Sequence, residues 1–254
     1  MTILRRLIME TIVISDSVTR IENSAFKDNT DLKFVTIPNS VTEIGDDAFS
    51  GCSNLQSICI PNTVRKIGSG AFCRCKNLRS VVMPLLDFNN AQSVISRWAF
   101  MSCEKLEYVI LPDTMDIIAD DAFAGCVNLK SFVCYKSGYR LASNQLPTGI
   151  IGGGAFTRCD SLQRVVLPDT ITVIEDYAFA CCKSLTTLDL PKSLLFIGWR
   201  AFWRCENLKA LELPDSMISV EKEAFLKCPS LKTIRCSNPS VLYDAKLRKG
   251  IQII

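Results

Sequence analysis

The dipeptide Ala-Phe occurs nine times in this chain of 254 residues, and most copies lie 23 residues apart. The gaps between successive phenylalanines are 23, 23, 28, 23, 33, 23, 23 and 23 residues. A fixed period of this size indicates a solenoid, in which one small unit is stacked repeatedly and contacts only its neighbours. The nine phenylalanines are Phe26, Phe49, Phe72, Phe100, Phe123, Phe156, Phe179, Phe202 and Phe225.

The repeat unit reads L-x-x-I-x-I-P-x-x-V-x-x-I-G-x-x-A-F-x-x-C in residues 55–75. The L-x-x-I-x-I run predicts a short strand with alternate side chains in the core, and Pro61 ends it because proline lacks a backbone donor. The V-x-x-I pair is a second apolar segment, and A-F-x-x-C predicts one helical or 3₁₀ turn. Each unit cannot bury its apolar groups alone, so stacking is required.

A cysteine follows the phenylalanine by three residues in every unit except the first, which has Asn29. With this position included, the unit resembles the BspA-type leucine-rich repeats of bacteria and parasitic protists over residues 9–236. In leucine-rich repeats, a small buried Asn or Cys at such a turn hydrogen-bonds the adjacent backbone. The resemblance implies a leucine-rich repeat solenoid, α/β or mostly β. It would be a right-handed curved superhelix with a parallel β-sheet on its concave face, and short strands and helical or 3₁₀ turns elsewhere.

The whole chain, residues 1–254, is predicted to form a single solenoid domain. Its predicted parts are an N-terminal cap, nine to ten repeats with two insertions, and a C-terminal cap. These are residues 1–8, 9–236 with insertions near 85–94 and 136–154, and 237–254. Insertions in repeats form loops on one face, often the binding face. Neutral drift in tolerant loops is the alternative explanation.

The charge and the cysteines limit the classes of protein that this chain can represent. A formal net charge of +3 favours neither a nucleic-acid-binding protein nor a membrane-surface protein. The N-terminal residues lack the apolar segment of a secretory signal, and no apolar run is long enough to span a membrane. Thirteen cysteines is an odd number, and eight occupy the repeated position, which favours free thiols in a reducing compartment. We therefore predict a cytoplasmic protein, or a cell-surface or secreted one if a signal segment has been removed.

The sequence contains no histidine, which excludes the Ser-His-Asp and Cys-His catalytic groups and every metal site that uses histidine. The two close cysteine pairs, 73/75 and 181/182, each include a repeated cysteine, so a structural role is favoured over zinc binding. The triple glycine at 152–154 is not followed by Lys-Ser/Thr and is not a phosphate loop. We predict no catalytic residue, no cofactor and no metal, and a protein that is not an enzyme.

Residues that alternate with the core positions of the main strand should point outward on the concave face. One outward row contains five adjacent apolar residues, and such a patch often marks an interaction surface. The β-propensity of Val and Ile is the alternative reason for their presence. Tyr108 and Arg164 flank the patch, and aromatic residues and arginine are common binding anchors. The five apolar residues are Cys59, Val82, Ile110, Val133 and Val166.

A second candidate surface contains Trp199 and Trp203, in the segment W-R-A-F-W-R. In a helical turn the two tryptophans would share one face. They would either form an exposed protein contact or pack against neighbouring coils, including Tyr177.

We predict a non-enzymatic scaffold that binds a protein partner through the concave sheet and the overhanging loops. It is not expected to bind nucleic acid or to insert into a membrane. The resemblance implies an alternative, a cell-surface adhesin that binds host or extracellular-matrix proteins. A homodimer through the concave or convex patch also stays open.

Overall fold

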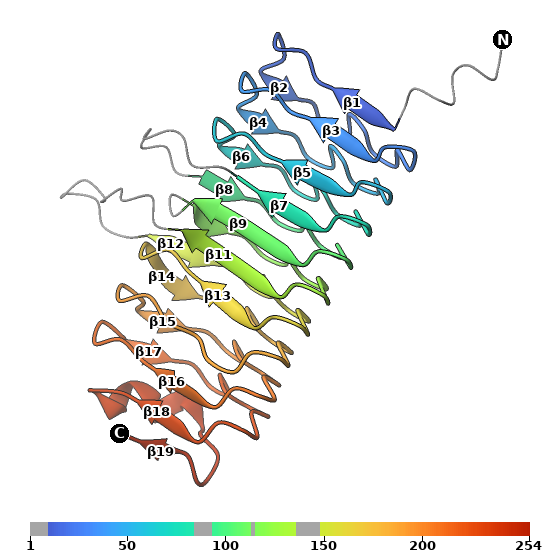
Figure 1. Cartoon of the computed structure of the whole chain (residues 1–254). Helices are drawn as coiled ribbons and strands as arrows, with labels where there is room; N and C mark the ends of the chain where they lie inside the picture. Colours follow the sequence, from blue (N-terminus) through green and yellow to red (C-terminus); the bar gives the residue numbers. More distant parts are fainter. Residues whose placement is uncertain (1–9, 84–92, 113–114, 136–147) are drawn as a thin grey trace, which may run out of the picture.

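The computed structural model describes residues 10–83, 93–112, 115–135 and 148–254. The predicted N-terminal cap and most of both predicted insertions lie outside these residues. The described chain winds into stacked coils that form an elongated column, with β1 and β19 at opposite ends (Figure 1). Within the described ranges, the chain forms no helix with the length and apolar character needed to span a bilayer.

The L-x-x-I-x-I segments form the predicted parallel strands in every coil except that of residues 187–189, which makes only an isolated bridge. Among the described residues, seven of these strands pair in chain order as sheet A, and three further strands form sheet C. Sheet A consists of β1 (Thr11–Val13), β3 (Phe34–Thr36), β5 (Ser57–Cys59), β7 (Ser80–Val82), β9 (Tyr108–Pro112), β11 (Ser131–Tyr135) and β13 (Arg164–Val166). Sheet C consists of β16 (Ala210–Glu212), β18 (Thr233–Arg235) and β19 (Gln252–Ile253).

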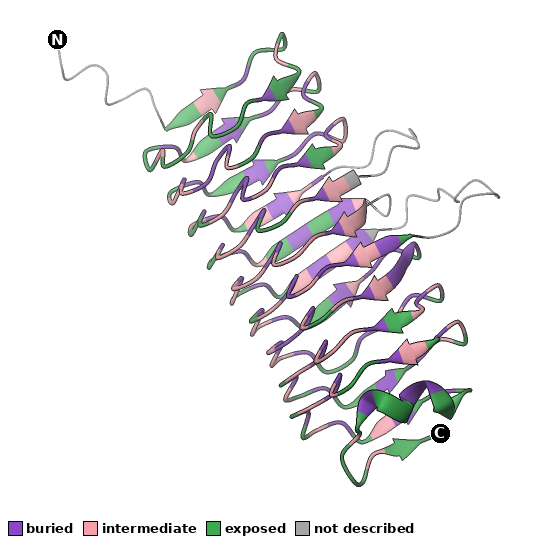
Figure 2. Ribbon diagram, turned by 180° about the vertical axis from the view of Figure 1, so that it is seen from behind, coloured by how far each residue is buried: buried purple, intermediate pink, exposed green. Residues whose placement is uncertain are grey.

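The second apolar segment of each unit also forms a strand, and these strands make a second parallel sheet, sheet B. The core lies between sheet B on one side and sheets A and C on the other, so buried residues alternate with exposed ones along the strands (Figure 2). Sheet B consists of β2 (Arg20–Ile21), β4 (Glu43–Ile44), β6 (Lys66–Ile67), β8 (Ser93–Ile95), β10 (Met115–Ile118), β12 (Gly149–Ile151), β14 (Ile171–Ile174), β15 (Phe196–Ile197) and β17 (Ser219–Val220). After β18, a 3₁₀ helix, η1 (Pro239–Ala245), and β19 end the described chain at the position of the predicted C-terminal cap.

The nine repeated phenylalanines form one continuous stack through the column. Neighbouring ring centroids lie 5.0–5.6 Å apart, and the ring planes differ by 4° to 18°. The edge of Phe132 also contacts Phe123 and Phe156, at centroid distances of 5.4 and 4.8 Å. The ring spacing matches the distance of about 4.8 Å between paired strands, so the stack follows the pitch of the coils.

The Ala-Phe segments form turns rather than helices. In the second coil, the N–H of Cys52 donates to the carbonyl oxygen of Phe49 at 3.1 Å, which is the i→i+3 bond of a 3₁₀ turn. Asp47 and Gly51 lie two residues before and after this phenylalanine and have φ of 54° and 74°. A left-handed residue ends a right-handed helix, and the same two positions are left-handed in every coil. Of the two forms that the sequence analysis allowed, the Ala-Phe segments therefore adopt the 3₁₀ turn and not the helical one.

The turns are also hydrogen-bonded from one coil to the next. The N–H groups of Asp47, Phe49 and Gly51 donate to carbonyl oxygens of the following coil at 2.7–2.8 Å. The coils are thus joined by backbone hydrogen bonds along three lines: sheet A, sheet B and the turns. A Cβ atom at Gly68 would lie 2.5 Å from the carbonyl carbon of Gly45, so a glycine there permits this close approach.

The repeated cysteines are free thiols that bond to the backbone of the preceding coil. Eight cysteine Sγ atoms donate to a phenylalanine carbonyl oxygen at 3.0–3.3 Å, which confirms the expected role of this position. Burial raises the pKa of the Cys52 thiol to about 11 and that of the Cys228 thiol to about 12. These two thiols therefore stay protonated and unreactive near neutral pH.

The phenylalanine stack should dominate the stability of the central coils. We expect Phe123→Ala to lower the free energy of unfolding by about 3–5 kcal/mol, because it removes a fully buried ring and leaves a cavity. Tyr243→Ala is the matched control, since Tyr243 is 90 % exposed and should cost less than about 0.5 kcal/mol. Urea unfolding measures both values. Equal effects of the two substitutions would show that the stack does not stabilise the coils.

The buried thiols also predict how stability depends on pH. The pKa of Cys52 is raised from 9.0 to about 11, so the folded state holds this proton more tightly than the unfolded state does. Its contribution to the free energy of unfolding should be fully present below pH 9 and should be lost as the pH rises toward 11. Urea unfolding on both sides of pH 9 should show a shallower decline for Cys52→Ala than for the wild type. Parallel declines in the two proteins would contradict this assignment.

Candidate protein-interaction surfaces

The predicted apolar patch lies on the outer face of sheet A, across five adjacent strands. The strand register places Val82 opposite Ile110, and Ile110 opposite Val133. It also places Val133 opposite Val166, and Cys59 opposite Val82. Ile110 is 39 % exposed, and the three valines are half-buried. The structure thus brings these five residues together in one continuous row, which we call stripe A.

Tyr108 and Arg164 lie in the neighbouring outward row, on either side of Ser131 in the register. The Tyr108 side chain is 47 % exposed, and the ammonium of Lys130 lies 5.9 Å from its ring centroid. Lys130 also donates to Glu107 at 2.6 Å, and this hydrogen bond lowers the pKa of the Glu107 carboxyl. Arg164 is exposed and forms no ion pair with any other residue that the structure describes. Stripe A is therefore flanked by an exposed tyrosine and by an unpaired guanidinium.

Sheet B carries a second apolar row that the sequence analysis missed. Val94 lies opposite Ile117, Ile117 opposite Ile150, and Ile150 opposite Val173. Val173 in turn lies opposite Phe196, which is 38 % exposed. The other four side chains are half-buried, and we call this row stripe B.

A signal for stripe B is present in the sequence, one residue before the isoleucine of each V-x-x-I pair. The first three positions of that column are charged, and the next five are apolar. The V-x-x-I pair by itself does not predict a strand, so the sequence does not indicate that this column faces outward. In chain order it reads Arg20, Glu43, Lys66, Val94, Ile117, Ile150, Val173, Phe196 and Ser219.

Trp199 and Trp203 do not share the face of a helix, because Arg200 and Arg204 adopt left-handed conformations with φ of 52° and 58°. Both tryptophans are half-buried and both contact the ring of Tyr177 in the preceding coil. The centroid distances to Tyr177 are 5.0 and 6.3 Å, with near-perpendicular planes at 76° and 88°. The packing against Tyr177 that we considered as an alternative is thus present.

Cationic side chains cover these tryptophans. The guanidinium of Arg200 lies 4.4 Å from the ring centroid of Trp199, and that of Arg204 lies 5.5 Å from the centroid of Trp203. Arg200 also pairs with Glu223 at 2.7 Å. This pairing lowers the pKa of the Glu223 carboxyl and raises the pKa of Arg200. Arg200 is therefore held in place over Trp199, which leaves less of this tryptophan than of stripe A available to a partner.

Within the described parts of the chain, no three Cys, Asp or Glu side chains converge as metal ligands would. The surfaces described above are contact surfaces of apolar, aromatic and charged groups. The sequence matches the BspA type leucine rich repeat region in six copies, over residues 5–130, 84–144 and 149–243.

The chain belongs to the BspA-type leucine-rich repeat family. The matched residues include both sheets, the phenylalanine stack and stripes A and B. The repeated phenylalanine and cysteine of the BspA-type unit are the groups that join one coil to the next. No curated protein is significantly similar to the chain in sequence.

Several solved structures are similar to this chain. A leucine-rich repeat protein from Eubacterium ventriosum is 23% identical, with a TM-score of 0.51 over 85% of this chain and 45% of that one. A leucine rich cell surface protein from Faecalibacterium prausnitzii is 22% identical, with a TM-score of 0.44 over 90% and 79% of the two chains. The pneumococcal vaccine antigen PcpA is 22% identical, with a TM-score of 0.48 over 90% and 62%. At this identity the likeness to the Eubacterium ventriosum structure shows the fold alone.

The ring contacts of Tyr177 should fix the positions of Trp199 and Trp203 and contribute to the stability of the fold. We expect Tyr177→Ala to lower the free energy of unfolding by about 2 kcal/mol, because two edge-to-face contacts are lost. The tryptophan fluorescence emission should also shift to longer wavelength as Trp199 and Trp203 gain solvent contact. Tyr243→Ala, at an exposed tyrosine, should change neither quantity. Unchanged emission in Tyr177→Ala would show that the tryptophans do not depend on this ring.

Proposed function

We propose that this BspA-type solenoid is a non-enzymatic scaffold that binds a protein partner through stripe A. The observation that carries the proposal is the continuous row of five exposed or half-buried apolar side chains on adjacent strands. Nothing in the coil requires an apolar residue at these outward positions, since the same row is polar or charged at Thr36 and Asp189. Burial of this row against a partner would gain roughly 25 cal/mol for each Å² of apolar surface removed from water.

Tyr108 and Arg164 are the proposed anchors beside stripe A. Tyrosine and arginine contribute large contact areas and directional polar groups at protein interfaces. The unpaired guanidinium of Arg164 offers a site for a carboxylate of the partner. Trp199 and Trp203 are a second, weaker candidate, because their rings already pack against Tyr177 and the nearby arginines. Stripe B has the same number of apolar residues as stripe A and serves as the internal control in the binding experiment.

The cellular compartment in which the protein would bind its partner stays a prediction. A cytoplasmic scaffold is the first expectation, and a cell-surface adhesin for host or extracellular-matrix proteins is the alternative. The two differ in the source of the partner, which is either a cell extract or extracellular material. A homodimer through either stripe is a third outcome, and the oligomeric state of the purified chain tests it directly.

Affinity capture with surface variants tests the proposal. We expect the wild-type chain to retain a partner that is lost when Val82, Ile110, Val133 and Val166 are all changed to Asp, because four charges would be desolvated in the interface. Capture from a cell extract and from extracellular material, followed by mass spectrometry, measures the loss.

The matched control changes Val94, Ile117, Ile150 and Val173 of stripe B to Asp. Both variants must keep the melting temperature within a few degrees of the wild type, so that a loss of binding reflects the surface. Loss only with the stripe B variant would transfer the function to sheet B. Equal retention by all three proteins would reject both stripes.

A further inference from the structure

Between sheets A and C, one coil does not continue the ladder of strands. Residues 187–189 occupy the strand position of their repeat, but they join β13 only by an isolated bridge between Val166 and Asp189. They are not paired with β16 at all. The N–H of Lys209 still donates to the carbonyl oxygen of Thr186 at 2.9 Å. The two coils therefore stay together just before the strand position and separate along it.

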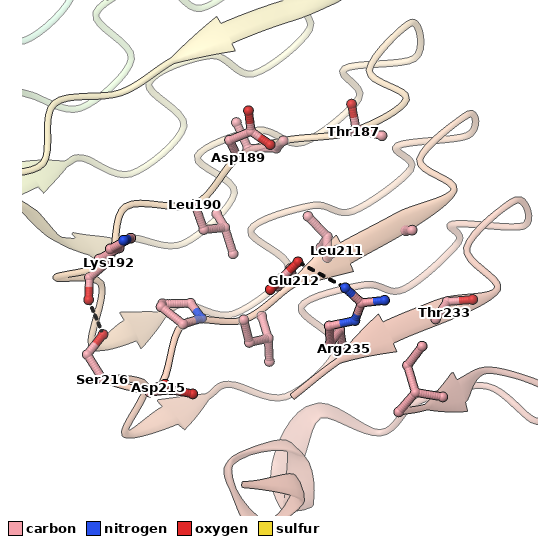
Figure 3. A pocket seen from close by; sticks show the side chains of 15 residues that line it. Thr187, Asp189, Leu190, Lys192, Leu211, Glu212, Asp215, Ser216, Thr233 and Arg235 are labelled. Atoms are coloured by element: carbon pink, nitrogen blue, oxygen red, sulfur yellow. Dashed lines mark hydrogen bonds and ion pairs between the residues drawn. The ribbon is translucent and has the colours of Figure 1, made fainter. Parts of the chain in front are cut away.

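A depression of about 730 Å³ lies at this break, and we call it the break pocket (Figure 3). Residues 187–190 contribute one part of its lining, and β16 and β18 contribute much of the rest. Four leucines line the pocket: one of them, Leu190, is half-buried, and the other three are buried at 3–5 % exposure and form an apolar floor. The leucines are Leu188, Leu190, Leu211 and Leu213. The volume is within the range of about 300–1,000 Å³ that is typical of ligand sites.

The rim of the break pocket carries three carboxylates and two cations, a net charge of −1. These are Asp189, Glu212 and Asp215 against Lys192 and Arg235. Glu212 and Arg235 point toward one another and pair at 3.6 Å (Figure 3). Asp215 accepts a hydrogen bond from the Ser237 hydroxyl at 2.7 Å. The exposed Asp189 side chain forms no hydrogen bond or ion pair with any described residue, so its carboxylate is available to a ligand.

Asp189 also continues the outward row of stripe A, because its backbone bridges to Val166. Lys192, the remaining unpaired cation, follows Pro191 and lies outside that row. Six coil spacings of about 4.8 Å separate Cys59 from Glu212, so stripe A and the break pocket together span about 30 Å. An extended segment of about nine residues has this length.

We propose that the break pocket takes an aliphatic side chain of an extended partner segment, with a lysine or arginine of the same segment beside Asp189. The inference rests on the proposed function, since the segment reaches the pocket by crossing stripe A. A row about 30 Å long and about 10 Å wide offers about 300 Å² for each partner, against about 800 Å² in a stable protein–protein interface. This area suits a peptide segment better than the flat face of a second copy.

Two capped nonapeptides provide the probe, Val-Thr-Val-Thr-Val-Thr-Lys-Thr-Leu and the same sequence with Glu in place of Lys. Alternate residues of an extended peptide face one side, so the valines, the leucine and the charged residue can all face the protein. Titration into the ¹⁵N-labelled full chain should shift the backbone amide signals of residues 187–190 and β16. The Lys peptide should bind about two- to five-fold more tightly than the Glu peptide, as expected for one exposed ion pair.

Asp189→Asn should abolish the preference for the Lys peptide, and Asp215→Asn is the matched control that should retain it. The inference is overturned if neither peptide shifts the amides of the pocket. It is equally overturned if the preference is absent or survives in Asp189→Asn. Far-ultraviolet circular dichroism and the melting temperature establish that each variant is folded.

The two proposals fail in different ways. Loss of partner capture in the stripe A variant, with no peptide shifts at residues 187–190, would support the interaction surface and reject the break pocket. Peptide shifts that depend on Asp189, with normal partner capture by the stripe A variant, would support the break pocket and reject stripe A.

Discussion

The carbonyl oxygen of the repeated phenylalanine accepts two hydrogen bonds, and this shared acceptor joins each coil to the next. For Phe49 the donors are the N–H of Cys52 in its own coil and the Sγ of Cys75 in the following coil, both at 3.1 Å. The rings stack beside these bonds at the same pitch. A coil without its neighbour would expose a ring and leave a buried acceptor with half its partners. The solenoid is therefore stable only as an array.

Because the phenylalanine stack and the paired strands share one pitch, each strand position of one coil lies beside the same position of the next. Inward positions are committed to the core, and sequence variation is confined to the outward rows. Stripes A and B both occupy such rows, in coils whose phenylalanines are fully buried. Substitution within a stripe should thus leave the stack intact, which is why surface and stability can be tested separately in this molecule.

Much of this arrangement follows from sequence periodicity alone. Stripe A could be predicted because the L-x-x-I-x-I run is long enough to show alternation with a period of two. Sheet B was not predicted because several of its strands have only two residues, too few for alternation to appear. The left-handed residues two positions from each phenylalanine include Arg74, Trp98 and Tyr177. Their side chains do not signal positive φ, so the sequence could not decide whether Trp199 and Trp203 share a helical face or pack against Tyr177.

The break pocket could not be predicted, because the segment around Leu188 fits the strand pattern as well as its neighbours do. Pairing depends on the backbones of two adjacent coils, and the sequence of one coil does not report it. Near the break, the outward row of the sheet changes from apolar Val166 to charged Asp189. The apolar half of this row therefore meets its charged half at the pocket. An apolar row alone accepts many apolar segments. A partner without a cation would remove water from the Asp189 carboxylate without forming an ion pair with it, and this would cost binding free energy. In the proposed complex, stripe A therefore supplies most of the affinity and Asp189 most of the selection.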